Sequence, residues 1–326
     1  MRIVVTGAKG FVGSVLSLRA SELGHEVLAL DNNARGLNNI KQGVKFLRHD
    51  CMEGIGSALD KTGWDGVDAV FHLAAATGSL DKPLEELCRF NVGMTKVVYQ
   101  DAVDFGAKAF VWPTTSLALA VPDSPYVESK ERGRKWLLEA DKENGIAVPM
   151  RFFNVAGSYK GMTELRKDEV HILPVMVDCF LKGETFIING DDYDTCDGTP
   201  SRDFVNVLDV VEELLDLASL HARLGASACK ERFHPEDGAI WLGTGCSTTV
   251  QEVVGIFRQY VGDLKVQQAG RRAFDCGALE ICPKQRAQFE ASRGMLVPPH
   301  ISLRDELLEL MRQAEHLDVL GPQKAA

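Results

Sequence analysis

The first half of the chain alternates short apolar runs with longer stretches in which apolar residues recur every three or four positions. The short runs have the length and β-branched content of strands and lie at Arg2–Thr6, Glu26–Leu30, Val44–Leu47, Asp68–His72, Lys108–Trp112 and Ala147–Arg151. The longer stretches have helical periodicity and lie at Phe11–Leu23, Leu84–Phe105 and Tyr126–Asn144. This alternation predicts an α/β fold of Rossmann type, a doubly wound parallel sheet that binds its ligand at the carboxyl ends of the strands.

The alternation stops after about Asn154. Two long polar segments, Tyr159–Val170 and Gly190–Arg202, then separate shorter apolar runs, and a last amphipathic helix is expected at Leu303–Ala314. We therefore predict a dinucleotide-binding domain over residues 1–153 that also carries the catalytic groups. Residues 154–326 should form a smaller C-terminal α/β region that binds substrate, with some segments returning to the first domain.

Charge and composition exclude several classes of protein. Lys and Arg number 36 against 46 Asp and Glu, a net charge of −10, which argues against a general nucleic-acid binder. The sequence has no apolar run of the roughly 18 residues that a membrane helix needs and no apolar signal core near its start, so we expect a cytoplasmic protein without a membrane anchor. The eight cysteines include no CxxC pair and are expected to be free thiols, with no structural metal: residues 51, 88, 179, 196, 229, 246, 276 and 282.

Three glycines follow the first predicted strand at intervals of three residues. Gly7 permits a tight turn from strand to helix, Gly10 lets the backbone approach a pyrophosphate, and Gly13 lets the helix pack closely on the sheet. The phosphate then meets the free N–H groups of the helix N-terminus, near Phe11 and Val12. Because a strand precedes the glycines and a helix follows them, they predict a dinucleotide site.

Acidic residues follow the next two strands. Asp31 comes 18 positions after Gly13, where its carboxylate can accept hydrogen bonds from both hydroxyls of an adenosine ribose. It would repel a 2′-phosphate, and Asn32 and Asn33 rather than an arginine follow it, so NAD is favoured over NADP. Asp50 is either an acceptor for the adenine amino group or an ordinary loop aspartate.

A tyrosine and a lysine form a YxxxK motif near the start of a predicted helix. Tyr126 and Lys130 project from one face of that helix, one turn apart. The ammonium stabilises the phenolate and lowers the pKa of the tyrosine, which turns a poor base into a usable one. A strand that ends in Thr114-Thr115-Ser116 comes before this helix and supports the interpretation of the motif.

These motifs resemble the extended short-chain dehydrogenases/reductases, and within them the NAD-dependent nucleotide-sugar epimerases and dehydratases. Thr6 to Gly13 is similar to the TGxxGxxG motif of the family, and the resemblance spans nearly the whole chain. It continues in HLAA at residues 72–75, NVGMT at 91–95, RFFNVAG at 151–157, GDDYDTCDGT at 190–199, RDFVNV at 202–207 and RRAFD at 271–275. The second half resembles UDP-glucose 4-epimerases in particular. An acidic calcium loop at 191–197 is the alternative reading of that segment, but the spacing does not fit an EF-hand.

The resemblance implies roles for individual residues. Thr115, Tyr126 and Lys130 would be catalytic. NAD would be bound by Gly7, Gly10, Phe11, Val12, Gly13, Asp31, Asn32, Asp50, Cys51, Leu73, Ala74, Ala75, Asn91, Tyr126, Lys130 and Phe153. The nucleotide sugar would be bound by Thr115, Asn154, His171, Arg202, Arg272 and Asp275. The alternatives are surface positions for the two arginines and a packing role for His171. The family also implies a homodimer through a pair of helices that includes the Tyr126 helix.

Departures from the family pattern bear on the chemistry. Only ten residues separate Thr115 from Tyr126, so the loop that borders the sugar is short, and Asn206 stands where the family usually has histidine. Ser116 and Leu117 follow Thr115, where sugar dehydratases carry an Asp-Glu pair and uronate decarboxylases a Glu. Without these carboxyl groups, dehydration and decarboxylation by those routes are disfavoured.

The sequence therefore predicts an NAD-dependent epimerase that acts on a nucleotide sugar, most closely a UDP-hexose 4-epimerase. One alternative is a nucleotide-sugar oxidoreductase, which would exchange its NAD and accumulate NADH. Another is a non-catalytic nucleotide-binding protein on the same fold, against which the presence of Thr115, Tyr126 and Lys130 argues.

Overall fold

The computed structural model describes residues 1–33, 40, 43–77, 82–121, 123–164, 171–225, 232–233, 237–272, 275–294 and 296–319. Part of the predicted polar segment, residues 165–170, lies outside this range, as does Cys229. The other seven cysteines are free thiols. Among the helices of these ranges, none combines the length and apolar character needed to cross a membrane.

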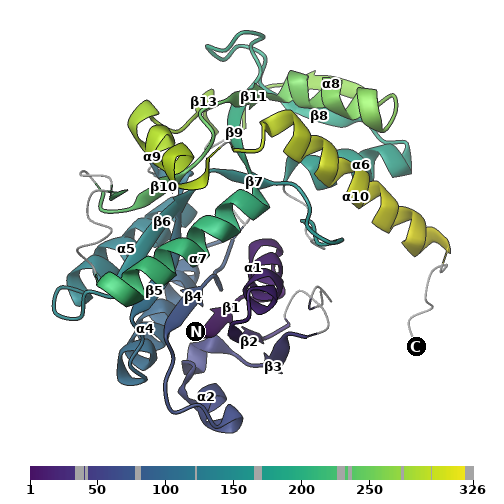
Figure 1. Cartoon of the computed structure of the whole chain (residues 1–326). Helices are drawn as coiled ribbons and strands as arrows, with labels where there is room; N and C mark the ends of the chain where they lie inside the picture. The colour runs from purple at the N-terminus through teal and green to yellow at the C-terminus, as the bar shows by residue number, and fades with distance from the viewer. Residues whose placement is uncertain are drawn as a thin grey trace.

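Seven parallel strands form the central sheet in the order β10-β6-β5-β4-β1-β2-β3 (Figure 1). Their bounds are Arg2–Thr6 (β1), Glu26–Asp31 (β2), Lys45–Arg48 (β3), Ala69–His72 (β4), Ala109–Thr115 (β5), Ala147–Phe152 (β6) and Ile240–Leu242 (β10). The first six strands agree with the predicted runs to within a few residues. The predicted α/β fold class is confirmed, and the strand order reverses beside β1 and β4, where a doubly wound fold binds its ligand.

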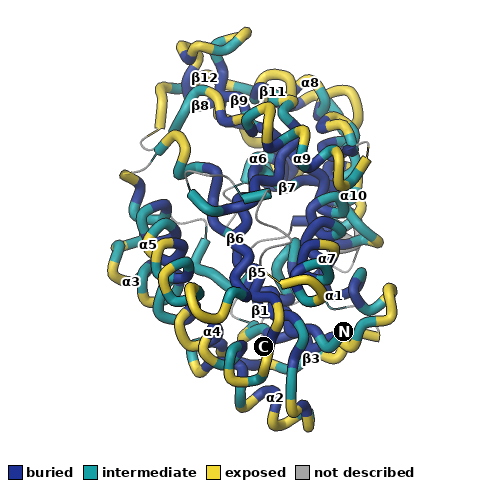
Figure 2. Tube along the Cα trace, turned by 60° about the vertical axis from the view of Figure 1, so that its left-hand side comes forward, coloured by how far each residue is buried: buried dark blue, intermediate teal, exposed yellow. Residues whose placement is uncertain are grey.

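Helices cover both faces of this sheet: α1 (Phe11–Glu22) and α7 (Val207–Leu224) on one, and α2 (Gly56–Thr62), α4 (Thr95–Asp104) and α5 (Pro125–Ala140) on the other. Side chains alternate between the two faces of each strand, so each strand contributes to the apolar core on both sides of the sheet. In β1, Ile3 and Val5 pack with α1 and α7, while Val4 packs on the opposite side, and all three side chains are fully buried. Figure 2 shows this burial as a continuous band through β1, β5 and β6.

A second group of elements stands beyond the carboxyl ends of the sheet (Figure 1). Its strands are β7 (Asn154–Ala156), β8 (Phe186–Asn189), β9 (Ser201–Asn206), β11 (Ser247–Thr249), β12 (Val266–Ala269) and β13 (Ala278–Leu279). β9 pairs with β7, β11 and β13, and β8 pairs with β12. The helices are α6 (Ile172–Lys182), α8 (Val250–Tyr260) and α10 (Pro299–Val319), which share one apolar core, and α9 (Pro283–Arg293), which packs on β10.

The predicted helix Leu84–Phe105 is interrupted. It consists of α3 (Leu84–Cys88), a π-helical turn at Arg89–Met94 and α4. Asn91 lies in the π turn, and its side chain bonds the backbone of Ala76 on a neighbouring loop. A π turn shifts the helix register locally and is often found at functional positions. Apolar periodicity does not reveal it, because the periodicity continues on both sides.

Two further differences from the sequence prediction involve strands. The predicted polar segment Gly190–Arg202 ends too late, because Ser201 and Arg202 already belong to β9 and pair with β11 and β13. β10 was not predicted, since three apolar residues are too few to identify a strand. It pairs with β6, so a late segment of the chain closes the edge of the main sheet.

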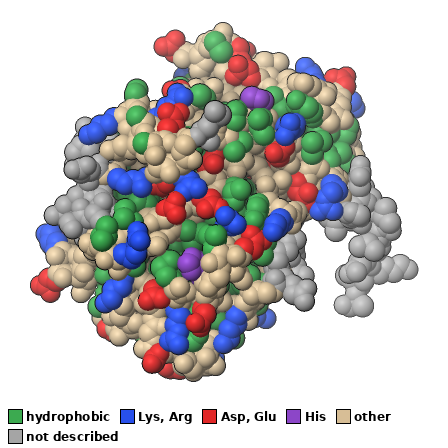
Figure 3. Space-filling model, viewed as in Figure 1, with side chains coloured by type: hydrophobic (Ala, Val, Ile, Leu, Met, Phe, Trp, Pro, Cys, Tyr) green, Lys and Arg blue, Asp and Glu red, His purple; other side chains and the backbone are tan. Residues whose placement is uncertain are grey.

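Lys, Arg, Asp and Glu are intermingled over the face in Figure 3, with no single-sign patch.

Candidate active site

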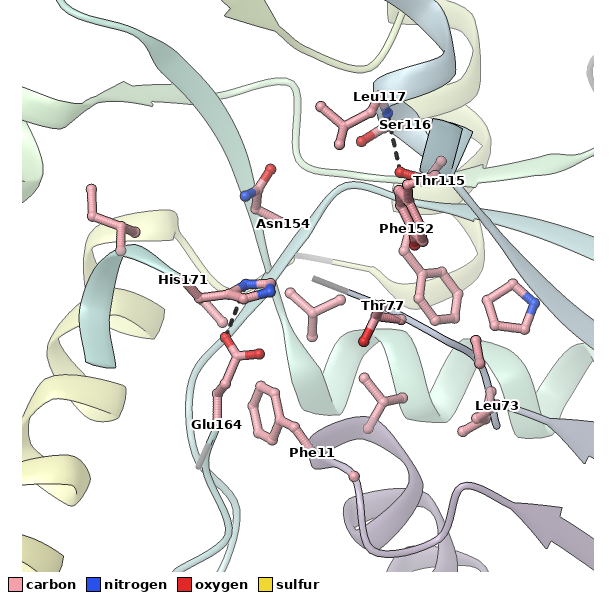
Figure 4. Close-up of a pocket in the computed structure, with 18 of the residues that line it drawn as sticks. Phe11, Leu73, Thr77, Thr115, Ser116, Leu117, Phe152, Asn154, Glu164 and His171 are labelled. Atoms are coloured by element: carbon pink, nitrogen blue, oxygen red, sulfur yellow. Dashed lines mark hydrogen bonds and ion pairs between the residues drawn. The ribbon is translucent and has the colours of Figure 1, made fainter. Parts of the chain in front are cut away.

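One large cavity, about 840 Å³ in volume, opens between the carboxyl ends of the central strands and the second group of elements. Every residue predicted for the site lines it except Asn91. Figure 4 shows part of this cavity, with Phe11, Leu73, Thr77 and Phe152 around the same space. Thr115 lies on one side of it, and Asn154 and His171 lie on the other. The fold thus brings together groups that are up to about 270 positions apart in the sequence, from Gly7 to Asp275.

The glycine turn between β1 and α1 leaves no room for side chains. Gly7 has φ +67°, and a Cβ there would lie 2.7 Å from the backbone nitrogen of Ala74. A Cβ on Gly13 would collide with the carbonyl oxygen of Gly7. The bare backbone and the free N–H groups at the start of α1 form the surface that a pyrophosphate requires.

Replacing Gly13 by Ala is expected to destabilise the protein by about 1–3 kcal/mol, because α1 must move away from the turn. The dinucleotide that copurifies should decrease at the same time. Gly255→Ala in α8 is the matched control, since nothing lies within 4 Å of a Cβ there, and it should stabilise the helix by up to about 1 kcal/mol. Urea unfolding with cofactor determination measures both effects, and equal behaviour of the two variants would contradict this account.

Asp31 is held at the end of β2 by backbone donors. Its Oδ2 accepts a hydrogen bond from the N–H of Lys9 at 3.0 Å, and its Oδ1 accepts one from the N–H of Asn33 at 2.7 Å. The Lys9 ammonium donates to Asn33 Oδ1 at 2.9 Å. The carboxylate therefore stands fixed at the mouth of the glycine turn, as ribose recognition requires. Lys9 was not selected from the sequence, because a lysine between two glycines has no distinctive spacing.

Asp50 has a local structural role in addition to its place in the cavity wall. Its carboxylate accepts a hydrogen bond from the N–H of Met52 at 3.0 Å and caps the short 3₁₀ turn Cys51–Glu53. The Cys51 thiol lines the cavity as well, and burial raises its pKa to about 12. Cys51 is therefore an unreactive wall residue near neutral pH.

Lys130 is buried at the base of the cavity, only 3% exposed. Its Nζ donates a hydrogen bond to the carbonyl oxygen of Pro113 at 2.9 Å and lies 4.7 Å from the centre of the Trp112 ring. Burial lowers the pKa of this ammonium to about 7. A lysine so desolvated is costly, and such groups concentrate at functional sites.

The short connection between Thr115 and Tyr126 is closed by local hydrogen bonds. Thr115 Oγ1 accepts a hydrogen bond from the N–H of Leu117 at 3.3 Å and caps a 3₁₀ turn at Ser116–Leu119 (Figure 4). Ser124 then provides the N-cap of α5, with proline at its first position, a favoured place for proline in a helix. Tyr126 thus lies in the first turn of α5, and it lines the cavity together with Thr115 and Lys130.

Asn91 lies behind the cavity wall and links three elements. Its Nδ2 donates to Ser129 Oγ at 2.9 Å and its Oδ1 accepts from the N–H of Ala76 at 2.9 Å. Ser129 in turn donates to the carbonyl oxygen of Tyr126 at 2.7 Å. These bonds tie the loop after β4 to the first turn of α5.

His72 in the HLAA segment is fully buried beside this network. Its Nδ1 lies 2.8 Å from Thr6 Oγ1, which also accepts a hydrogen bond from the N–H of Ala74 at 3.2 Å. Burial and the nearby Lys130 charge lower the pKa of His72 to about 3. The imidazole is therefore neutral at physiological pH, and the Thr6 hydroxyl on β1 contacts both this ring on β4 and the loop that follows it.

The part of the cavity wall formed by the second group of elements carries two arginines on either side of one aspartate. Arg202 Nη2 lies 2.5 Å from Asp275 Oδ1, and its Nη1 donates to three backbone carbonyls. Arg272 Nη2 lies 3.4 Å from Asp275 Oδ2, and its side chain is 61% exposed. Residues 273–274 of the RRAFD segment lie outside the described part of the chain. The cluster is a fixed guanidinium beside an exposed one, an arrangement suited to an anionic group.

His171 contacts a carboxylate that the sequence did not indicate. Its Nδ1 lies 3.2 Å from Glu164 Oε2, and both residues line the cavity (Figure 4). Asn154 begins β7 on the same side of the cavity. The carboxylate is 92% buried, whereas the imidazole is partly exposed. Glu164 had no signal in the sequence, because its pairing with His171 depends on the fold.

Fold and site together define a class of protein. A doubly wound sheet, a glycine turn followed by Asp31, and a Thr-Tyr-Lys group in the same cavity are the features of an extended short-chain dehydrogenase/reductase. The family model described as "NAD dependent epimerase/dehydratase family" matches residues 3–224, about two thirds of the chain. The chain belongs to this family, and NAD is confirmed as its cofactor.

Curated relatives agree with this assignment, and a solved structure shares the fold. The chain is 29% identical to a UDP-glucose 4-epimerase of Corynebacterium glutamicum over 93% of both chains. It is 30% identical to that of Streptococcus mutans over 84% of this chain and 86% of the relative. The solved UDP-glucose 4-epimerase of Brucella ovis in complex with NAD has a TM-score of 0.78 at 24% identity, covering 95% of this chain and 98% of that one.

Proposed function

We propose that the protein is an NAD-dependent UDP-hexose 4-epimerase. The prediction of a nucleotide-sugar 4-epimerase agrees with the curated relatives, which carry that activity in their names over most of both chains. The observation that carries the proposal is one cavity that contains Asp31, the Thr115-Tyr126-Lys130 group and the Arg202–Asp275 cluster. A cofactor, a reacting carbon and a diphosphate can then be in contact at the same time.

The residues at the β1 end fit NAD. The glycine turn offers bare backbone to the pyrophosphate, Asp31 presents its carboxylate to the ribose, and the cavity continues past Phe153 to Lys130. When bound, NAD supplies the hydride acceptor for the sugar C4 carbon and the donor for the return step. Because the cofactor would be regenerated within each turnover, the reaction needs no exchange of NAD with the solvent.

Tyr126 is the proposed base. Its phenolate would take the proton of the sugar 4-hydroxyl, and Thr115 would donate a hydrogen bond to the same oxygen. Lys130, held by Pro113, would stabilise the phenolate and contact the nicotinamide ribose. In the return step, Tyr126 would give the same proton back to the C4 oxygen as the hydroxyl re-forms.

The sugar must turn over between the two half-reactions while its diphosphate stays bound. Asn154, His171, Arg202 and Arg272 are the proposed anchors of the nucleotide, with Asp275 beside the arginines. Anchoring of the diphosphate would let the hexose rotate about its link to that group without leaving the cavity. Positioning of this kind accounts for much of an enzyme's rate.

Arg202→Met should raise the KM for the nucleotide sugar by about 10- to 100-fold, because charge-assisted bonds to a phosphate are each worth about 1.5–3 kcal/mol. The kcat should change much less, since the Arg202 guanidinium would hold the diphosphate and not the reacting carbon. Arg258→Met is a matched control: Arg258 on α8 forms a surface ion pair with Asp263, which follows the helix, at 3.4 Å. A KM that responds equally in both variants would exclude Arg202 from substrate binding.

The residues after Thr115 favour epimerisation over other reactions of the family. Ser116 and Leu117 line the cavity beside Thr115, and neither carries a carboxyl group to remove water or to promote decarboxylation. A net oxidoreductase on this scaffold is the alternative, and it would accumulate NADH in proportion to the sugar consumed.

The test uses the protein as purified, without added cofactor. It is incubated separately with UDP-glucose, UDP-galactose and their N-acetyl and uronate counterparts, and the anomeric protons are followed by NMR. Appearance of the 4-epimer in at least one mixture supports the proposal and identifies the sugar. No epimer in any mixture, with or without NADH formation, would reject it.

We also propose a cytoplasmic homodimer that associates through α5 and its neighbouring helix. The exposed side of α5 carries Glu128 and Arg132, paired at 2.5 Å, and α4 exposes Val97 at 40%. Light scattering should give twice the 35.7 kDa chain mass. Charge reversal at Arg132 should then favour the monomer, and an unchanged dimer would place the interface elsewhere.

A further inference from the structure

Four charged side chains, two of them buried and two partly buried, form a cluster next to the catalytic group. Arg151 on β6 contacts Asp237, with Nη2 to Oδ2 at 2.6 Å, and Glu131 on α5, with Nη2 to Oε1 at 3.2 Å. Arg134 on α5 lies 2.7 Å from Glu131 Oε2 and donates to the backbone carbonyl of Asp237. The Arg151 side chain is only 2% exposed, and those of Asp237 and Arg134 are 12% and 10% exposed. We name Glu131, Arg134, Arg151 and Asp237 the charge quartet.

The quartet contains two cations and two anions, so its formal charges cancel. Further bonds fix Asp237: its carboxylate accepts from the indole N–H of Trp241 at 3.1 Å and from the N–H of Ala239 at 3.0 Å. These donors hold the carboxylate of Asp237 in one orientation, facing Arg151. Removing its charge would leave two guanidinium groups against one carboxylate in a nearly dry site, and such an uncompensated charge forces local rearrangement.

The quartet and Lys130 together hold three successive residues at the end of β5. Lys130 Nζ bonds the carbonyl oxygen of Pro113 at 2.9 Å. The hydroxyl of Thr114 donates to Glu131 Oε1 at 3.2 Å, and Arg151 Nη1 donates to the carbonyl oxygen of Thr115. The end of β5, which carries Thr115, is thus bonded on one side to α5, the helix that carries Tyr126 and Lys130. On the other side it is bonded to β6 through Arg151.

We propose that Arg151 and Asp237 are positioning residues of the active site. Asp237 holds Arg151 against the carbonyl of Thr115, and the quartet thereby sets the distance between Thr115 on β5 and the Tyr126-Lys130 pair on α5. This inference rests on the proposed function for its kinetic readout. Neither residue lines the cavity, so they act on the reaction only through these contacts.

The test is Asp237→Asn, which keeps the shape of the side chain and removes its charge. The kcat per bound NAD is expected to fall by about 10- to 100-fold, the usual cost of a displacement of about 1 Å at a reacting group. The KM should stay within about twofold of wild type, because the anchors of the nucleotide are untouched. Asp237→Glu, which restores the charge, should recover much of the loss.

Glu213→Gln is the matched control. It breaks another ion pair, between Glu213 and Arg232. The Glu213 side chain is 0% exposed, and its carboxylate bonds Arg232 and Ser292 and not β5 or α5. This variant should lose stability without losing kcat per bound NAD. If both variants lose activity only in proportion to unfolding, the quartet is merely structural and the proposal fails.

A crystal structure of the Asp237→Asn variant provides a readout that does not need turnover. It should show Thr115 displaced relative to Tyr126 and Lys130, with the Arg151–Thr115 bond broken. An unchanged arrangement of the three would overturn the positioning role, whatever the activity. If the wild-type protein has no epimerase activity but Thr115 is displaced in the Asp237→Asn structure, the proposed epimerase function is rejected and the positioning role remains supported.

Discussion

Tyr126→Phe should lower kcat by about 10³- to 10⁴-fold, the upper range for loss of a general acid–base group. Phenylalanine keeps the ring and its packing at the start of α5 but has no oxygen to take the proton of the sugar hydroxyl. Without that transfer, hydride cannot leave the carbon, because the alkoxide would not form. The measurement is the initial rate of epimer formation per bound NAD.

The control for this variant is its cofactor content. Asp31 and the glycine turn are unaffected by the substitution, so NAD should copurify at the wild-type level. An inactive variant that had lost its NAD would say nothing about Tyr126 as a base. Activity above about one tenth of wild type with full NAD content would contradict the assignment.

Lys130→Met should have opposite effects on activity and stability. The kcat should fall by about 100-fold or more, since Tyr126 loses the cation that stabilises its phenolate. The variant should be more stable than wild type at pH 6, because the folded wild-type protein must keep a charged lysine in a fully buried place. Its pKa of about 7, against the ordinary 10.5, opposes folding by up to about 5 kcal/mol there.

The sign of the pH dependence follows from proton binding. Between pH 7 and 10.5 the unfolded chain carries a proton on Lys130 that the folded protein has lost, so wild-type stability rises through this window. Below pH 7 both states bind the proton and the full penalty remains. The advantage of Lys130→Met should thus be greatest at pH 6 and should disappear towards pH 10.

Urea unfolding of both proteins at pH 6 and pH 9.5 measures this difference. Loss of the bond to Pro113 reduces the net gain of the variant by about 1 kcal/mol, so an advantage of about 1–4 kcal/mol is expected at pH 6. If the variant is less stable than wild type at pH 6, the buried charge of Lys130 does not oppose folding of the wild-type protein.

The sequence predicted the parts of the site that depend on local pattern. The glycine turn, Asp31 and the YxxxK motif each lie within one strand-turn-helix unit, and their neighbours in the chain are their neighbours in space. A parallel sheet then places the ends of β1, β2 and β5 on one edge, so the cavity follows from the order of the elements.

The rest of the site depends on contacts that sequence spacing does not record. Asp237 meets Arg151 across 86 positions, and Arg202 meets Asp275 across 73. At the π turn, the Asn91 side chain bonds Ala76 and Ser129, and apolar periodicity cannot show these contacts. Glu164 was missed for the same reason, since nothing near it in sequence indicates a partner for His171.

The most direct test of the central claim follows the hydrogen at the sugar C4 carbon. UDP-glucose deuterated at C4 is incubated in ordinary water with the protein as purified, and the 4-epimer is analysed by NMR and mass spectrometry. Resident NAD as both acceptor and donor predicts that the deuterium is fully retained at C4 of the product, with no NADH in solution. Loss of the label to water, or accumulation of NADH with a 4-keto sugar, would contradict the account.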